Sequence, residues 1–142
     1  MNKLFYIISW FAIISAMVLL FVYLFWQFYP YKTIKFNTPV YKVLNENKTV
    51  KQGGVLIYEI DYCKYTDQEP VVTKYYVDGI VYQTSPARGV VKKGCHVTQV
   101  YNDVPKALPP GEYNMKVLID YSVNPIRDIF HTNFTEKFTI TK

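Results

Sequence analysis

The chain has 142 residues, and 16 Lys and Arg against 11 Asp and Glu give it a formal net charge of +5 at pH 7. The lysines are spread along the sequence rather than clustered, which argues against a nucleic-acid partner. The charge instead indicates a solvated surface above anionic lipids or an anionic cell envelope.

The N-terminal stretch from Leu4 to Trp26 carries no charge. At about 1.5 Å per residue such a helix is about 34 Å long, which is enough to cross a hydrocarbon core of about 30 Å. A cleavable signal peptide has a shorter apolar region and small residues at its cleavage site, whereas this stretch runs into FWQFYPY. Trp and Tyr favour the membrane interface, and Pro30 ends a helix. We therefore expect a retained transmembrane anchor over residues 1–30 that spans the lipid bilayer with residues 4–26; a cleaved signal and a buried core helix are the disfavoured alternatives.

The flanking charges give a weak indication of orientation. Lys3 precedes the apolar stretch, whereas Lys32, Lys35 and Lys42 follow it, and by the positive-inside rule this favours a cytoplasmic C-terminus. Against this, so short an N-terminal tail is typical of an uncleaved signal anchor, and the remainder has two cysteines and a strand-rich pattern. We expect a single-pass membrane protein with a cytoplasmic N-terminus and a periplasmic or extracellular C-terminal domain.

Residues 31–142 form one domain by length, and their apolar residues alternate with polar ones more often than they follow a helical period. Asp78-Gly79 lies between two β-rich runs and predicts a hairpin. Together these features predict a mainly β protein whose domain is a single immunoglobulin-like antiparallel β-sandwich of about seven strands, with a small barrel as the alternative. The expected strands are Thr33–Val43, Val55–Tyr62, Val71–Val77, Ile80–Thr84, Cys95–Tyr101, Glu112–Val123 and Phe134–Thr141.

Tyr113 follows a Leu-Pro-Pro-Gly turn at the start of an expected strand. In Greek-key sandwiches a tyrosine at this place often bonds its hydroxyl to backbone a few residues upstream. We expect Tyr113 to be such a structural corner, bonded toward Lys106–Leu108.

Cys63 ends the second expected strand and Cys95 begins the fifth. In a seven-strand sandwich these strands are antiparallel neighbours, so a Cys63–Cys95 disulfide is expected in an oxidising compartment. The alternative is a metal site of the two cysteines with His96 and Met115, which falls short of a closed four-ligand spacing. His131 has no obvious partner and is expected at the surface.

Motifs for catalysis are absent from the sequence: there is no Gly-x-Ser-x-Gly elbow, no phosphate-binding glycine loop and no HExxH. The carboxylates lie mostly on expected strand faces and turns. We expect no enzyme, no catalytic residue, no cofactor and no small-molecule substrate. Lys92-Lys93, with Arg88, is the one dense basic spot and could touch lipid headgroups.

The segment VNPIRDIF is the candidate partner loop. Asn124-Pro125 interrupts the strand pattern, and Ile126 and Arg127 follow where a solvated hairpin would be polar; arginine is a favoured hot-spot residue. The alternative is that Ile129 and Phe130 already belong to the last strand and point into the core.

The anchor together with LIYEIDYCKY, VDGIVY, GCHV, VPKALPPGEY, VNPIRDIF and TEKFTI resembles small single-pass membrane proteins of tailed bacteriophages with an immunoglobulin-like domain. The resemblance implies a bacterial host and a periplasmic domain, and it brings no functional residues. Two functions follow as expectations: a protein-binding module in the cell envelope, or a structural component of a virion or membrane complex without its own binding activity.

Overall fold

The computed structural model describes residues 3–78, 80–89 and 91–142. The chain divides into two compact units. One comprises the N-terminal residues to Tyr31 together with Ser122–Asp128, and the other comprises Lys32–Tyr121 and Ile129–Lys142.

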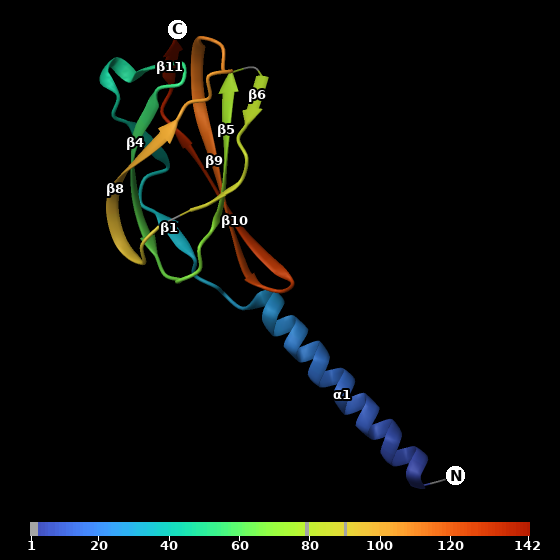
Figure 1. Ribbon diagram of the computed structural model, residues 1–142. Coiled ribbons are helices and arrows are strands. Elements are labelled where there is room, and N and C mark those ends of the chain that lie inside the picture. The colour runs from blue at the N-terminus through green and yellow to red at the C-terminus, as the bar shows by residue number, and fades with distance from the viewer. Residues whose placement is uncertain (1–2, 79, 90) are drawn as a thin grey trace. The chain divides into compact units, whose positions relative to one another are not determined.

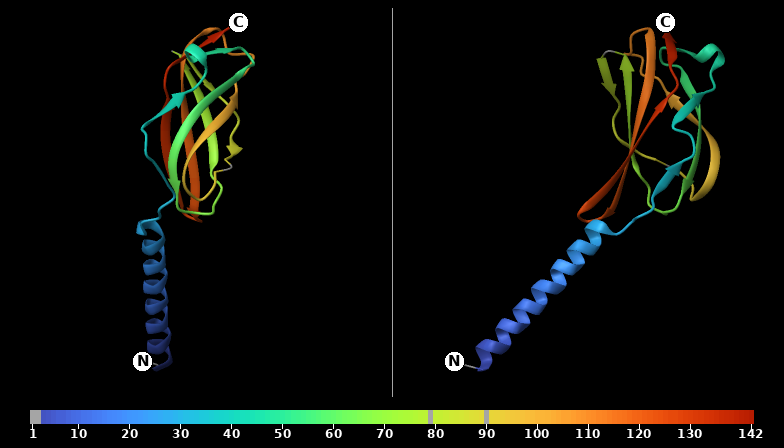
Figure 2. Two further views of the ribbon diagram at one scale, coloured as in Figure 1. Left: turned by 90° about the vertical axis from the view of Figure 1, so that its left-hand side faces the viewer. Right: turned by 180° about the vertical axis from the view of Figure 1, so that it is seen from behind.

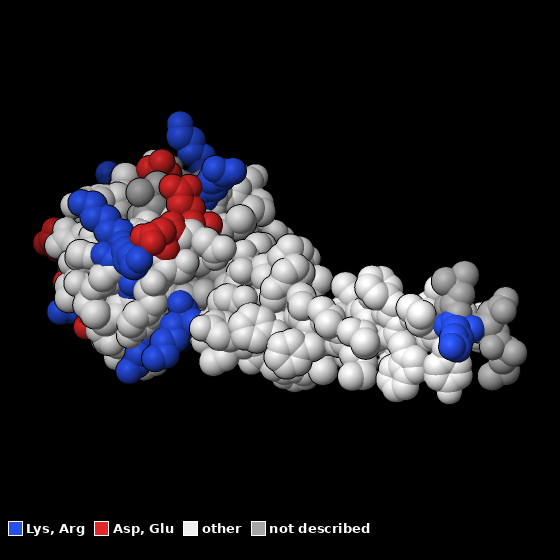
Figure 3. Space-filling view, turned by 90° about the horizontal axis from the view of Figure 1, so that it is seen from below, with Lys and Arg blue, Asp and Glu red and all other residues white. Residues whose placement is uncertain are grey.

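The first unit contains a single long helix, α1 (Lys3–Phe28, 26 residues), whose only charged residue is Lys3 at its start (Figure 3). Its stretch Phe5–Phe28 is long and apolar enough to cross a membrane, and none of it is buried against protein. The helix ends two residues before Pro30, which lacks the N–H that a further turn would need. The expected apolar helix is therefore present and extends two residues beyond Trp26.

The second unit is built of strands (Figure 1). Together with the tip of the β9–β10 hairpin, the described residues form eleven of them. Their bounds are β1 (Ile34–Phe36), β2 (Val40–Val43), β3 (Thr49–Lys51), β4 (Val55–Lys64), β5 (Val71–Asp78), β6 (Ile80–Gln83), β7 (Ala87–Arg88), β8 (Gly94–Asp103), β9 (Gly111–Asn124), β10 (Arg127–Thr135) and β11 (Phe138–Thr141), with a short 3-10 turn at Glu46–Lys48.

The strands gather around two long members, β4 and β9. β4 pairs with β1, β2 and β8, all antiparallel. β9 pairs antiparallel with β5 and β11 and is also next to β10. A parallel pairing of β2 with β10 joins the two groups into one hydrogen-bonded network, and a second parallel pairing attaches β3 to β11. In Figure 2 the β4 group and the β9 group lie on opposite sides of the domain.

The core lies between these groups because both long strands bury every second residue. In β4 the buried positions run from Leu56 to Lys64, and in β9 from Tyr113 to Tyr121. Such alternation buries one face of each strand, and each large side chain that leaves water contributes about 1.5–3 kcal/mol. The core is rich in tyrosine, and Tyr41 and Tyr58 stack with ring centroids 5.6 Å apart.

The prediction of a mainly β chain with an N-terminal apolar helix is confirmed, but several expected strands have other limits. The expected strand Thr33–Val43 is two strands, since Asn37, Thr38 and Pro39 separate β1 from β2. The expected strand Phe134–Thr141 is also two: β10 begins earlier, at Arg127, and β11 follows it. The short strands β3 and β7 were not expected. The predicted turn at Asp78-Gly79 falls on residue 79, which lies outside the described residues.

Candidate functional site

Strand β8 is the most accessible long strand of the domain. Within the described part of the chain it pairs with β4 alone. Most of its ten residues are exposed, and the side chains of Val97 and Tyr101 keep 63% and 65% of their accessible surface. β8 is therefore an edge strand whose far side has no strand beside it.

The backbone of β8 can be oriented from the bonds that β4 makes. The carbonyls of Ile57 and Asp61 accept hydrogen bonds from amides on the side of β1 and β2, so they point away from β8. Their register partners on β8 are Tyr101 and Val97. In an antiparallel ladder such non-bonded pairs direct their own N–H and C=O groups outward on both strands. The backbone groups of Val97 and Tyr101, and by the same alternation those of Cys95 and Gln99, point to the open edge.

A cleft of about 660 Å³ lies beside this edge, between β8 and strands β5 and β7. Inward-facing residues of both strand groups form its floor, and polar residues of β8 and of the segment after β6 form its rim. The apolar and aromatic residues of the lining are Ile34, Phe36, Tyr41, Tyr58, Ile60, Tyr62, Val72, Ala87, Val91, Val100, Tyr101, Val117 and Ile119. The volume falls in the range of about 300–1,000 Å³ that is usual for ligand sites.

A polar network bridges the two groups of strands at the cleft. The ammonium of Lys74 donates to Oδ1 of Asn102, and Nδ2 of Asn102 donates to the hydroxyl of Tyr76 at 2.5 Å. That hydroxyl is 3.4 Å from the carbonyl of Asp103. Burial lowers the pKa of Lys74, against the opposing attraction of Asp103. Burial also raises the pKa of Tyr76 to about 12, so its hydroxyl stays a proton donor.

Cys63 and Cys95 are register partners in the β4–β8 ladder, and their sulfur atoms are 2.04 Å apart, at disulfide distance. The bond ties the edge strand to its one neighbour. In this state the two sulfurs are not thiolate ligands. The other members of the alternative metal site have separate contacts, because His96 Nε2 is 2.9 Å from the Lys93 carbonyl and the Met115 sulfur is 3.7 Å from Nδ2 of Asn102.

The Tyr113 side chain is buried, and its hydroxyl donates to the carbonyl of Pro109 at 2.9 Å. This is the bond of a tyrosine corner. Its acceptor lies one residue beyond the expected range Lys106–Leu108, because the turn places the carbonyl four residues upstream against the ring. The contact positions the start of β9 and has no role at the cleft.

His131 is not the unpartnered surface residue that the sequence suggests. It lies half-buried on β10 with Nε2 2.8 Å from the hydroxyl of Thr33. Its ring also packs edge-on against Phe36 and Tyr121. Burial lowers the pKa of the imidazole. No sequence signal identifies this contact, since Thr33 is 98 residues away along the chain.

The candidate partner loop is the tip of the β9–β10 hairpin, and it belongs to the same unit as α1. Nδ2 of Asn124 donates to the Trp26 carbonyl at 2.9 Å, and Nη1 of Arg127 donates to the Tyr29 carbonyl at 2.7 Å. The last carbonyls of a helix have no partner within the helix, and a cation there is favourable. The tip thus caps the C-terminal end of α1.

The alternative, that Ile129 and Phe130 belong to a strand and point into the core, agrees with the structure in part. Ile129 and Phe130 belong to strand β10, but Phe130 points outward and is 59% exposed. Ile126 is also exposed, so the tip retains an apolar surface in addition to its contacts with α1.

In the basic spot formed by Lys92, Lys93 and Arg88, the ammonium of Lys93 bonds the Asp67 carboxylate at 2.8 Å.

Comparison with known proteins gives no relative in sequence: no protein family and no curated protein matches the chain. Solved structures do match. The CARDB domain of a Pyrococcus furiosus protein, in complex with di-metal ions, shares 15% identity at a TM-score of 0.31, covering 79% of this chain and 93% of that one. A β-glucosidase from Listeria innocua, in complex with glucose, shares 11% identity at a TM-score of 0.31 over 72% of this chain, which spans only 15% of the enzyme. Similarity at this level supports no argument about activity.

Proposed function

We propose that this chain is a membrane-anchored, protein-binding module of a cell envelope. In this proposal α1 spans the bilayer, and the β-domain is an immunoglobulin-like sandwich on the periplasmic or extracellular side. The uncharged 24-residue stretch of α1 supports the anchor. The paired cysteines support an oxidising compartment for the domain. The resemblance to phage membrane proteins makes a bacterial envelope the setting that we propose.

The open edge of β8 is the observation that carries the binding function. Proteins usually block such edges with proline, lysine, a bulge or a covering segment. The outward positions of β8 are Cys95, Val97, Gln99 and Tyr101, which include neither proline nor lysine. An edge that stays open over this length can accept an extended segment of another protein as an added strand. Main-chain hydrogen bonds then supply affinity, and alternate side chains supply specificity.

A proline substitution at the edge tests this proposal. The N–H of Gln99 points away from β4, so Gln99→Pro removes one donor from the open edge and none from the β4–β8 ladder. Capture of envelope proteins by the tagged full chain should fall at least about tenfold, while the melting temperature changes by only a few degrees.

Gln99→Ala is the matched control, because it removes the side chain but keeps the N–H, and it should retain capture. Thr98→Pro reports on the backbone assignment: it removes a bond of the ladder and should destabilise the domain. Undiminished capture by Gln99→Pro would refute strand addition at β8. Absence of any captured protein would favour the alternative role as a structural component.

The hairpin tip is a second contact surface that we propose, on the strength of its exposed Ile126 beside Arg127. The double variant Ile126→Ala/Arg127→Ala should weaken capture without unfolding the domain. Arg127→Ala alone separates the two roles, because it breaks the bond to the Tyr29 carbonyl and leaves Ile126 in place. If capture is unchanged in the double variant, the tip serves only to cap α1.

The orientation is tested in intact cells. After permeabilisation of the outer membrane, added protease should digest the β-domain, and a cytoplasmic control protein should survive. A protected domain would reverse the orientation and favour the one that the lysines at positions 32, 35 and 42 indicate.

A further inference from the structure

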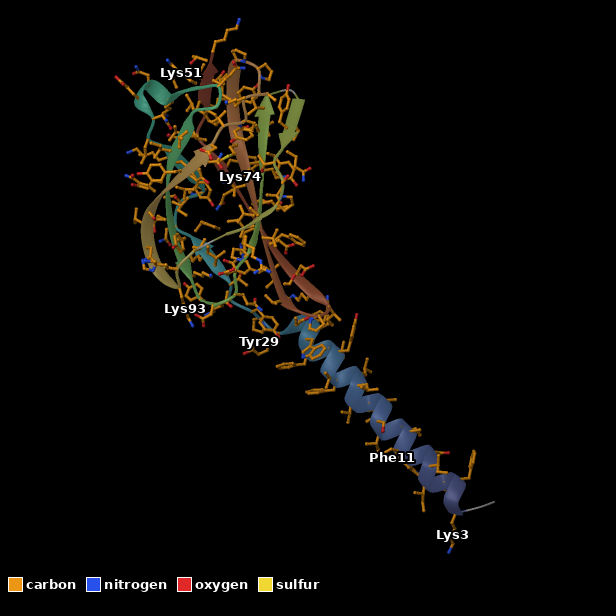
Figure 4. The ribbon with its side chains drawn as sticks, in the orientation of Figure 1. Lys3, Phe11, Tyr29, Lys51, Lys74 and Lys93 are labelled. Atoms are coloured by element: carbon orange, nitrogen blue, oxygen red, sulfur yellow. A yellow bond between two sulfur atoms is a disulfide. The ribbon has the colours of Figure 1, made fainter. Side chains whose placement is uncertain are left out.

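Lys74 occupies an unusual place for a lysine. Along β5 it alternates with Val72 and Tyr76 on the face that turns toward the core, and its side chain reaches Asn102 on β8. Figure 4 labels it in the middle of the β-domain. The side chain is half-buried, and a charge that is partly withdrawn from water is costly unless it is paired with an opposite charge. The groups within hydrogen-bond distance of the Lys74 ammonium therefore decide how its charge is stabilised.

The protein itself gives this ammonium only a partial partner. Among the described residues its one hydrogen bond goes to Asn102 Oδ1, which is the oxygen of a neutral amide. The ion pairs in that part of the chain are made by Lys48, Lys93 and Lys137, and Asp103 attracts Lys74 only from beyond ion-pair distance. An ammonium has three donors, so Lys74 has donors left for an incoming anion. Arg88 adds a second cation at the rim of the cleft.

The rest of the cleft favours a hydrocarbon rather than a small polar ligand. Its floor consists of aliphatic side chains and aromatic rings contributed by β1, β2, β4, β5 and β9. Burial raises the pKa of Tyr41 and of Tyr58 above the ordinary tyrosine value, so both rings stay uncharged at physiological pH. A small anion would satisfy the cation and make no contact with the apolar floor. A neutral hydrocarbon would contact the floor and leave the cation without an anion.

We propose that the cleft between β8 and β5 binds a long-chain carboxylate, with its headgroup on Lys74 and its hydrocarbon chain along the apolar floor. The headgroup forms a charge-assisted hydrogen bond in a partly desolvated site, where such bonds are strongest. The chain packs against the aliphatic and tyrosine side chains of the floor. This is a ligand site separate from strand addition, because it uses side chains inside the cleft and none of the outward backbone groups of β8.

Photolabelling of the full chain in nanodiscs of phosphatidylcholine tests the site. The probe is a palmitic acid that carries a diazirine on its chain, and the matched probe is the corresponding alcohol, which lacks only the charge. After irradiation, mass spectrometry should find the acid on peptides of β4 and β9, in addition to the label on α1 that partition into the bilayer produces. The alcohol should label α1 equally and the β-domain at least about tenfold less.

Substitution of the cation completes the test. Lys74→Met replaces the side chain by an unbranched apolar one that is a single atom shorter and carries no charge; replacing a charge that is partly withdrawn from water by an apolar group is usually tolerated. It should lower labelling of the β-domain by the acid about tenfold and leave labelling by the alcohol unchanged. Lys74→Arg should restore most of the labelling, and Lys137→Met, on an exposed lysine, should have no effect.

Three results would overturn the inference: equal labelling by acid and alcohol, which shows apolar partition only; label confined to α1; and full competition by inorganic phosphate, which shows a simple anion site. Gln99→Pro should still take up the acid. Failure of strand addition at β8 and failure of this site are therefore distinguishable.

Discussion

The two long strands β8 and β9 differ in how much of each is buried. β9 has neighbours on both sides, β5 on one and β10 and β11 on the other, and Tyr113, Met115 and Tyr121 are almost inaccessible. β8 is a regular ten-residue strand, yet only Asn102 is buried. Length and regularity are therefore poor guides to burial.

The largest expected difference between the strands is in the cost of truncating a side chain. Met115→Ala on β9 should cost about 2–5 kcal/mol of unfolding free energy, because it leaves a cavity in the core. Val97→Ala on β8 should stay within about 0.5 kcal/mol. Chemical denaturation followed by near-ultraviolet circular dichroism of the tyrosines measures both, since the two tryptophans, Trp10 and Trp26, lie in α1. Similar costs would contradict the assignment of β8 as an edge.

Loss of the disulfide that joins β8 to β4 should have the next largest effect on stability. Closing a loop between positions 32 residues apart stabilises a domain by about 3.5–4 kcal/mol in the chain-entropy model, and often by less in practice. The double variant Cys63→Ser/Cys95→Ser should lose about 2–4 kcal/mol in denaturant. Reduction of the wild-type protein should lower its free energy of unfolding by the same amount, whereas reductant should not change that of the double variant. A maleimide that reacts with the denatured, unreduced wild type would argue against the bond.

A smaller effect is expected at the start of β9. Tyr113→Phe removes only the hydroxyl that donates to the Pro109 carbonyl, so it should cost about 0.5–1.5 kcal/mol. Tyr101→Phe on β8 is the matched control, because among the residues that the structure describes that hydroxyl bonds only the exposed Gln99 side chain, at 3.2 Å. Thermal denaturation of the two variants side by side would show whether the corner contributes stability.

The smallest effect is a pH dependence at His131, whose ring packs on Tyr121 of β9. Because burial lowers its pKa below the ordinary value of about 6.5, the unfolded chain takes up this proton first as the pH falls. The stability that the neutral ring contributes is thus present above about pH 6.5 and is lost as the pH falls through the folded value. His131→Gln should flatten the dependence of the melting temperature on pH between about pH 7 and pH 5. A wild-type profile that is already flat would contradict this account.

The same contrast explains what the sequence could predict. The apolar helix and β9 follow from residue pattern alone, since EYNMKVLIDY alternates in polarity except at Leu118 and LFYIISWFAIISAMVLLFVYLFW has no charge. The Cys63–Cys95 pairing follows from strand order. The breaks near Pro39 and between Thr135 and Phe138 depend on which neighbour each segment meets, and short strands such as β7 have no pattern of their own.

The candidate site was largely beyond sequence reasoning. On β5 the two faces read Val71, Thr73, Tyr75 and Val72, Lys74, Tyr76, and propensity alone would place the lysine outward. It faces inward because Tyr76 packs in the core, and a side chain two residues before it must share its face. Likewise GCHVTQVYND does not reveal that one side of β8 has no neighbour, because this depends on where the segment after β6 runs. The contact of His131 with Thr33 joins the two ends of the domain sequence, and no sequence pattern near either residue predicts it.

Because the backbone of β8 alternates in direction, the amides that face the open edge can be compared with the amides bonded to β4 within the same strand. The amides of Val97, Gln99 and Tyr101 face the open edge, whereas those of His96, Thr98 and Val100 lie in the ladder with β4. In deuterated water the first set should exchange quickly and the second slowly, within one strand and under identical conditions. A bound strand would slow the odd-numbered amides alone, so a single spectrum of the free and bound protein would report both the location of the ligand and the integrity of the sheet beneath it.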